Sequence, residues 1–145
     1  MINDNDDTYD ADLNSGIGAY DSKNFSMAYQ LLAPLAANDN AEAIWRIGMM
    51  QSFGLGMIEN QKQGVESFQR AVDLGHDMAL HMLGVAYMMG EGVEKNLDTA
   101  IFWFEKAAAV GLQGAAFSLS MIYSDMLDDN KKAEEWINIA NKMDS

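Results

Sequence analysis

The chain contains no cysteine and a single proline among its 145 residues. The lack of cysteine excludes disulfides, thiolate metal sites and cysteine nucleophiles. One proline beside 12 methionines favours helices with an adaptable interior over a strand-rich sandwich. A cysteine-free composition is compatible with the cytoplasm, which is the location we expect.

Long apolar runs and basic clusters are also missing. No stretch approaches the ~20 apolar residues of a membrane span, and the N-terminus lacks the basic and apolar regions of a secretory signal. The 9 basic residues face 22 acidic ones, giving a net charge of −13, and they are scattered apart from Lys131-Lys132. We therefore expect no binding to nucleic acid or membranes. Such acidity would attract a basic protein partner, although it also serves solubility by itself.

The sequence contains an internal repeat with a period of 36 residues. Shifting the chain by 36 positions gives eight identities in one repeat length, where ordinary composition gives about two. The identical pairs are Ala43/Ala79, Gly48/Gly84, Gly54/Gly90, Gly56/Gly92, Asn60/Asn96, Phe68/Phe104, Ala71/Ala107 and Gly75/Gly111. A third copy follows in which Tyr87 recurs 36 residues later as Tyr123, but Trp103 recurs only 33 later as Trp136. Three residues are therefore lost from the loop of the third copy.

Each repeat is predicted to form two helices. The first helices are expected over 41–53, 77–89 and 113–125, and the second over 61–74, 97–110 and 131–143. Glycines follow most of these helices where a left-handed cap is favoured, and asparagines at 40, 60 and 96 can cap the helix starts. Gly48 and Gly84 lie inside helices, at a cost of ~1 kcal/mol each against alanine. Their repetition indicates close contact between helices.

The N-terminal part is predicted to be a divergent pair over 13–39. A helix is expected over 25–37, kinked or shortened by Pro34, with Asn38-Asp39 in place of the capping glycine. Residues 1–12 contain five aspartates and are expected to form a flexible acidic tail. Residues 13–145 are then expected to form a single domain with repeats at about 40–75, 76–111 and 112–143.

The segments 79–87, 90–96 and 100–111 carry the pattern of a known family: ALHMLGVAY, GEGVEKN and AIFWFEKAAAVG. They closely resemble the Sel-one-like repeat (SLR) family, relatives of the tetratricopeptide repeats. The resemblance covers about residues 14–143 and is weakest in the third repeat, which has Ser120 for the helix glycine. It implies an all-α superhelical solenoid of antiparallel helix pairs, whose first helices line a concave surface. It also implies an adaptor or scaffold, commonly bacterial.

Helical geometry predicts which residues face that surface. If Leu83, Gly84 and Tyr87 face the partner helix, the other phases of the first helices face the groove. Among these positions, ten form the predicted partner-binding set: Trp45, Met49, Phe53, Met78, His81, Val85, Met88, Met89, Phe117 and Met121. Such an apolar, methionine-rich surface is typical of an interaction site. Two alternatives remain. If the register is shifted by one residue, these side chains belong to the core. If it is not, the third helix pair or a second copy of the chain covers the groove.

No catalytic, metal-binding or cofactor-binding pattern is evident. His76 and His81 are five residues apart, whereas a zinc protease helix needs two histidines four apart beside a glutamate. The Gly54-x-Gly56 and Gly90-x-Gly92 pairs lack the strand and the basic residue of a phosphate loop, so we interpret them as turn glycines. Some secreted, cysteine-rich SLR proteins are linked to β-lactam hydrolysis. This chain lacks their cysteines, which leaves that activity only as a remote alternative.

Two functions remain open from the sequence. A small, acidic protein with an apolar groove fits an immunity protein that neutralises a basic toxin. The alternative is a regulatory adaptor or scaffold that docks a peptide or helix of a signalling or envelope protein. Both are non-catalytic and need no cofactor, and the sequence identifies neither the partner nor the oligomeric state.

Overall fold

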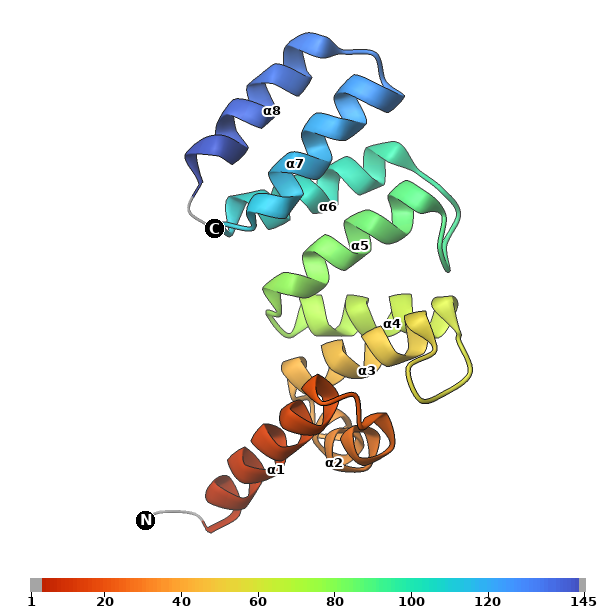
Figure 1. Ribbon diagram of the computed structural model, residues 1–145, viewed down its shortest axis with the longest axis vertical. Coiled ribbons are helices and arrows are strands. Elements are labelled where there is room, and N and C mark those ends of the chain that lie inside the picture. Colours follow the sequence, from red (N-terminus) through yellow and green to blue (C-terminus); the bar gives the residue numbers. More distant parts are fainter. Residues whose placement is uncertain (1–3, 144–145) are drawn as a thin grey trace. The chain divides into compact units, whose positions relative to one another are not determined.

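The computed structural model of the protein describes residues 4–143, which contain helices and no strand. The helices are α1 (Asp4–Asp21), α2 (Phe25–Ala37), α3 (Ala41–Phe53), α4 (Gln61–Asp73), α5 (Asp77–Met89), α6 (Leu97–Ala109), α7 (Gln113–Met121), a π-helical turn η1 (Ile122–Met126) and α8 (Asn130–Lys142) (Figure 1). The fold class predicted from the repeat, an all-α solenoid of helix pairs, is confirmed.

The helices form two compact units, Met1–His76 and Asp77–Ser145. In the first unit α1 packs on α2, α2 on α3, and α3 on α4. In the second unit α5 packs on α6, α6 on α7, and α7 on α8. The expectation of a single domain over 13–145 stays a prediction.

Asparagine side chains cap the starts of three helices, α3, α4 and α6. The side-chain oxygens of Asn40, Asn60 and Asn96 accept hydrogen bonds from backbone amides three residues later, at 2.9, 3.0 and 3.1 Å. Each bond satisfies an amide that the helix itself leaves unpaired. The N-cap positions predicted from the sequence are therefore confirmed.

The helix ends use left-handed residues, as the sequence predicts. Gly54, Gly75, Gly90 and Gly111 all have positive φ, between 64° and 96°. At the end of α2 the same conformation is adopted by Asp39, at φ 66°. An aspartate tolerates this region better than most side chains, so the first pair ends like the others without a glycine.

Gly48 and Gly84 bring two pairs of helices into close contact. A β-carbon at Gly48 would lie 2.8 Å from the ring of Phe68, and one at Gly84 would lie 2.6 Å from that of Phe104. Both rings are almost completely buried. The absence of a side chain is what lets each ring pack against the helix backbone, which confirms the close contact inferred from the repeated glycines.

The N-terminal pair follows the same design. A β-carbon at Gly16 in α1 would lie 2.6 Å from a methyl group of Leu32 in α2. Leu32 precedes Phe68 by 36 residues, but Gly16 precedes Gly48 by only 32. The turn between α1 and α2 covers only residues 22–24. Because this turn is short, a comparison at a fixed offset of 36 residues does not align Gly16 with Gly48.

The structure bears on two expectations for the N-terminal part. Residues 4–12, expected to be a flexible tail, continue α1 as helix, and residues 1–3 lie outside the described part. A helix held by packing near Gly16 extends at little cost, because each added residue gains a hydrogen bond. The flexibility of this segment stays a prediction. Helix α2 runs over the full 25–37, so Pro34 does not shorten it.

The loop of the third repeat is three residues shorter than the loops of the other two repeats. In each repeat the amide of the residue that caps the second helix donates to a carbonyl near the end of the first helix: Asn60 to Gln51, Asn96 to Tyr87, and Asp129 to Tyr123, at 2.7–2.9 Å. The acceptors are spaced by 36 residues, but the last donor follows by 33. The chain there forms η1 and a left-handed Asp128 in place of the two loop glycines.

Candidate functional site

One surface of the second unit gathers apolar side chains from α5 and α7. We call it the α5–α7 face and define it by six residues: Met78, His81, Val85, Met89, Phe117 and Met121. Their spacing of three and four residues places them along one side of each helix. A β-carbon at Gly114 would lie 3.7 Å from Cε1 of His81, so α7 meets α5 at this point of the face.

Large apolar side chains of this face lie open to solvent. The exposed fractions are 43% for Met78, 55% for Met89, 40% for Phe117 and 39% for Met121. Val85 and His81 lie half-buried between them. Unbranched, polarisable methionines beside an aromatic ring form a surface that adapts its shape to a partner.

His81 extends this surface as an apolar group. Its ring makes an edge-to-face contact with Phe104 at a centroid distance of 5.3 Å. Burial lowers the pKa of His81 below its ordinary value of 6.5, because the charged form loses hydration. At neutral pH the imidazole is therefore uncharged and adds to the apolar character of the α5–α7 face.

Met88 does not belong to this face, contrary to the sequence-based prediction. It is 8% exposed and belongs to the core. Met88 follows Leu80 and Gly84 at a spacing of four residues, so the three lie on one stripe of α5. That stripe is buried because Gly84 meets Phe104 of α6 there.

In the first unit, the predicted residues of α3 differ in exposure. Phe53 is 51% exposed at the end of the helix, and Trp45 and Met49 are half-buried. The indole of Trp45 stacks on the ring of His76 at a centroid distance of 5.0 Å and an interplanar angle of 20°. Trp45 is thus partly fixed by an intramolecular contact that the sequence does not reveal.

Charged groups around Trp45 form a network that joins α1, α3 and the end of α4. Nε2 of His76 lies 2.6 Å from Oε2 of Glu42, whose other oxygen accepts a hydrogen bond from Nε of Arg46 at 2.8 Å. Arg46 also pairs with Asp21 at 3.0 Å and places its guanidinium 4.8 Å from the ring centroid of Tyr20. This network positions the edge of α3 on which Trp45 lies.

The network changes the acidity of its members. The hydrogen bond from His76 lowers the pKa of Glu42 below its ordinary value of 4.5; burial opposes this, and Arg46 adds to it. Burial acts to lower the pKa of Arg46, but hydrogen bonds to Glu42 and Asp21 outweigh it and raise that pKa. The charged forms of both groups are therefore favoured, and the cluster acts as a structural ion pair.

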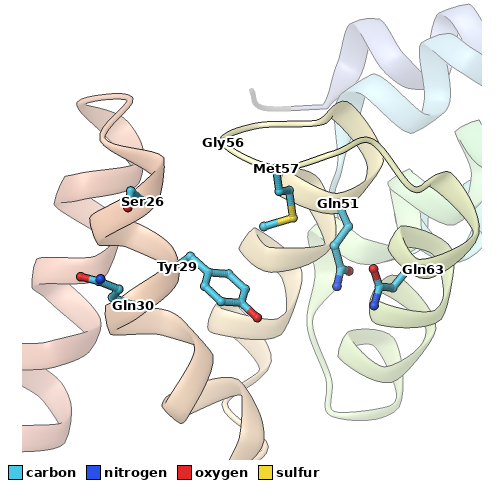
Figure 2. Close-up of a pocket in the computed structure, with 7 residues that line it drawn as sticks. All are labelled: Ser26, Tyr29, Gln30, Gln51, Gly56, Met57 and Gln63. Atoms are coloured by element: carbon cyan, nitrogen blue, oxygen red, sulfur yellow. The ribbon is translucent and has the colours of Figure 1, made fainter.

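A second site in the first unit was not predicted from the sequence. A hollow of about 450 Å³ is lined by residues of α2, α3, α4 and the α3–α4 loop: Ser26, Tyr29, Gln30, Gln51, Gly56, Met57 and Gln63 (Figure 2). Glutamines on helix surfaces are common and carry no periodic signal, so nothing in the sequence pattern marked this place. Its size falls within the range of about 300–1,000 Å³ of ligand pockets.

Neither site contains a recognisable set of catalytic or metal-binding groups. Within residues 4–143, no three histidine, aspartate or glutamate side chains are grouped so that they could hold a metal ion. None of the helices in that range is both long and apolar enough to cross a bilayer. The chemistry that the two surfaces offer is burial of apolar side chains on one and hydrogen bonding on the other.

Antiparallel helix pairs repeated at 36 residues, with exposed apolar side chains on their first helices, define a helical-repeat protein of the tetratricopeptide-like class. Residues 41–76 and 77–112 each match the Sel1 repeat. The chain therefore belongs to the Sel1-like repeat family, whose members are mostly non-catalytic scaffolds for protein interaction.

Known proteins support this assignment. A Sel1 repeat protein from Oxalobacter formigenes superposes with a TM-score of 0.78 at 26% identity, covering 90% of this chain and 55% of that one. Chitin synthase regulatory factor 2 of Schizosaccharomyces pombe is 30% identical over 57% of this chain and 16% of its own length. The HRD3A component of an ERAD-associated E3 ubiquitin-protein ligase in Arabidopsis thaliana is 34% identical over 44% of this chain and 10% of its own. The chain thus spans less than a fifth of these two curated relatives.

Proposed function

We propose that the chain is a non-catalytic protein-interaction module that binds a basic protein partner on the α5–α7 face. The observation that carries this proposal is the cluster of four exposed large apolar side chains there, Met78, Met89, Phe117 and Met121. Leaving such a cluster in water is unfavourable, and burying it under a partner helix or loop supplies the energy of association. Phe53 and Trp45 of α3 provide a second, smaller apolar surface on the other unit.

The charge of the chain supports a basic partner. With a net charge of −13, the protein attracts positively charged surfaces over long range and repels acidic ones. We expect the rate of association to fall as ionic strength rises, while the dissociation rate changes little. Stopped-flow measurements between 50 and 500 mM salt would check this, and an association rate that does not depend on salt would exclude electrostatic steering.

Two kinds of partner remain in the proposal. Chitin synthase regulatory factor 2 is named as a regulator and HRD3A as a ligase component, and these names favour the role of an adaptor. Acidity and an exposed apolar face favour an immunity protein against a basic toxin. Co-expression with the product of the neighbouring gene distinguishes the two, because an immunity protein rescues growth from a toxic neighbour and an adaptor does not.

The apolar face is tested by exchanging one aromatic residue. Phe117→Asp places a charge in the α5–α7 face and should abolish recovery of the partner from lysate of the native host. The matched control is Phe102→Asp in α6, because Phe102 is 49% exposed but lies outside the face. Both variants should keep the helical circular dichroism of the wild type. Loss of the partner with Phe102→Asp, and retention with Phe117→Asp, would place binding elsewhere.

A further inference from the structure

The hollow between α2 and α4 is lined by side chains that can form hydrogen bonds. In Figure 2 the ring of Tyr29 on α2, the thioether of Met57 in the α3–α4 loop and the amide groups of Gln51 and Gln63 converge on one space. Tyr29 and Gln63 are exposed, and Gln51 and Met57 are half-buried. The polar groups are thus open to a ligand from outside the chain, with an aromatic ring and a thioether beside them for packing.

The walls of the hollow are held in place before any ligand binds. Gly56 in the loop has a φ of 70°, and a β-carbon there would lie 2.6 Å from Cβ of Phe25 at the start of α2. The loop therefore rests directly on α2. On the other wall, the hydroxyl of Ser67 donates to Oε1 of Gln51 at 2.6 Å. This bond fixes the amide of Gln51 and leaves its Nε2 hydrogens to serve as donors.

The lining of the hollow is electrically neutral. None of its seven lining residues carries a charge, although the chain as a whole has a net charge of −13. Neutral donors and acceptors pair best with groups of the same kind, because an ionised ligand would lose hydration without gaining a counter-charge. The lining therefore favours an uncharged ligand that carries both donors and acceptors, as amide groups do.

The site is longer than one hollow. A second hollow of about 230 Å³ shares Tyr29 and Gln51 with the first and continues along α2 to Ala37. Its one charged lining residue, Arg70, is already paired with Asp39 and with the carbonyl of Ala36. From Ser26 to Ala37 the helix rises by about 16 Å, which equals the length of about five residues of an extended chain.

We propose that this groove binds an uncharged, extended peptide segment of about five residues through its main-chain amides. The amides of Gln51 and Gln63 and the hydroxyl of Tyr29 would pair with peptide N–H and C=O groups. Main-chain pairing gives affinity that depends little on sequence, and the small alanines at 33, 36 and 37 allow the chain to lie close to α2. This activity is separate from the apolar interaction proposed above and uses a different surface.

Selection from a displayed library of uncharged heptapeptides tests the proposal on the full-length chain. We expect peptides that bind the wild type and lose about tenfold in affinity with the double variant Tyr29→Phe/Gln63→Leu, which removes two hydrogen-bonding groups. The matched control is Gln69→Leu, on the same helix but outside the groove. It should change affinity less than about twofold, below the effect of one typical hydrogen bond. Tyr29 and Gln63 are exposed and Gln69 is half-buried, outside the core, so both variants should fold, and circular dichroism would check this.

Two further measurements make the outcome decisive. N-methylation of the central peptide bonds should weaken binding about tenfold if the main chain is recognised, and NMR should show shifts of the side-chain amides of Gln51 and Gln63. The proposal is overturned if no peptide is selected, if the double variant binds equally well, or if N-methylated peptides keep their affinity. Phe117→Asp should leave peptide binding unchanged, so that failure here and failure of the apolar face can be distinguished.

Discussion

Gly84 lies so close to Phe104 that a β-carbon on the glycine would be 2.6 Å from the ring. The contact joins α5 to α6 at a glycine inside α5, although glycine weakens a helix. Gly48 and Phe68 repeat it in the first unit, as do Gly16 and Leu32 in the N-terminal pair. In these helix pairs, a glycine on the first helix packs against a large side chain on the second, and this contact sets the distance between the two helices.

Gly84→Ala should destabilise the fold in spite of the higher helix propensity of alanine. The added methyl group must displace a buried ring, which typically costs about 1–3 kcal/mol, against a gain of about 1 kcal/mol from propensity. Urea denaturation would measure the difference. Gly18→Ala is the control, because nothing lies within 4 Å of a β-carbon there. It should stabilise the protein, and a destabilised control would show that propensity, not packing, had been misjudged.

Asn96→Ala should lower the free energy of unfolding by about 1 kcal/mol. The side chain of Asn96 accepts a hydrogen bond from the amide of Thr99 at the start of α6, and alanine leaves that amide unpaired. Asn96→Ser retains an acceptor at the same place and should recover most of the loss. Thermal denaturation of the two variants would check this. No loss with Asn96→Ala would show that the cap contributes nothing, and equal losses in both variants would show that the hydrogen-bond acceptor is not what stabilises the start of α6.

The Glu42–His76 contact should make stability depend on pH in the acidic range. The pKa of Glu42 is lowered in the folded protein from its ordinary value of 4.5. The stabilisation is therefore complete above pH 4.5 and is lost as the pH falls through the lower folded value. Urea titrations at pH 7 and pH 3 should show a smaller drop in Glu42→Gln than in the wild type. A control variant, Glu66→Gln, alters an exposed carboxylate of α4 and should retain the wild-type drop.

His81 should titrate below its ordinary pKa of 6.5 because burial disfavours its charged form. The unfolded chain then binds more protons than the folded one below pH 6.5, so stability is lost as the pH falls from there to the folded pKa. NMR titration of the ring protons would give that pKa directly. His81→Leu should remove this part of the pH dependence, and a His81 pKa at or above 6.5 would contradict the burial argument.

The sequence predicted the repeating part of the fold well because its signals are local. Asn40, Asn60 and Asn96 cap helices through bonds three residues away, and glycines such as Gly75 fix the turns through their own conformation. The equivalence of Gly16 was missed because it depends on a turn of different length.

The candidate sites were harder to predict because they depend on which neighbour covers each residue. Met88 was assigned to the surface, yet it follows the buried stripe that begins at Leu80. Trp45 lies half-buried on α3, and its contact with His76 joins residues 31 positions apart. The groove lined by Gln51 and Gln63 required three helices to be positioned before it could be recognised.

The hydrogen bond that closes each loop has a consequence for redesign of the protein. Because Asp129 still reaches Tyr123 with three fewer residues between them, the helix pair tolerates changes in loop length as long as this bond can form. The segment between Gly90 and Asn96 is thus a natural insertion point for foreign recognition sequences. A grafted epitope or protease site there should be displayed as long as the amide of Asn96 still reaches the carbonyl of Tyr87.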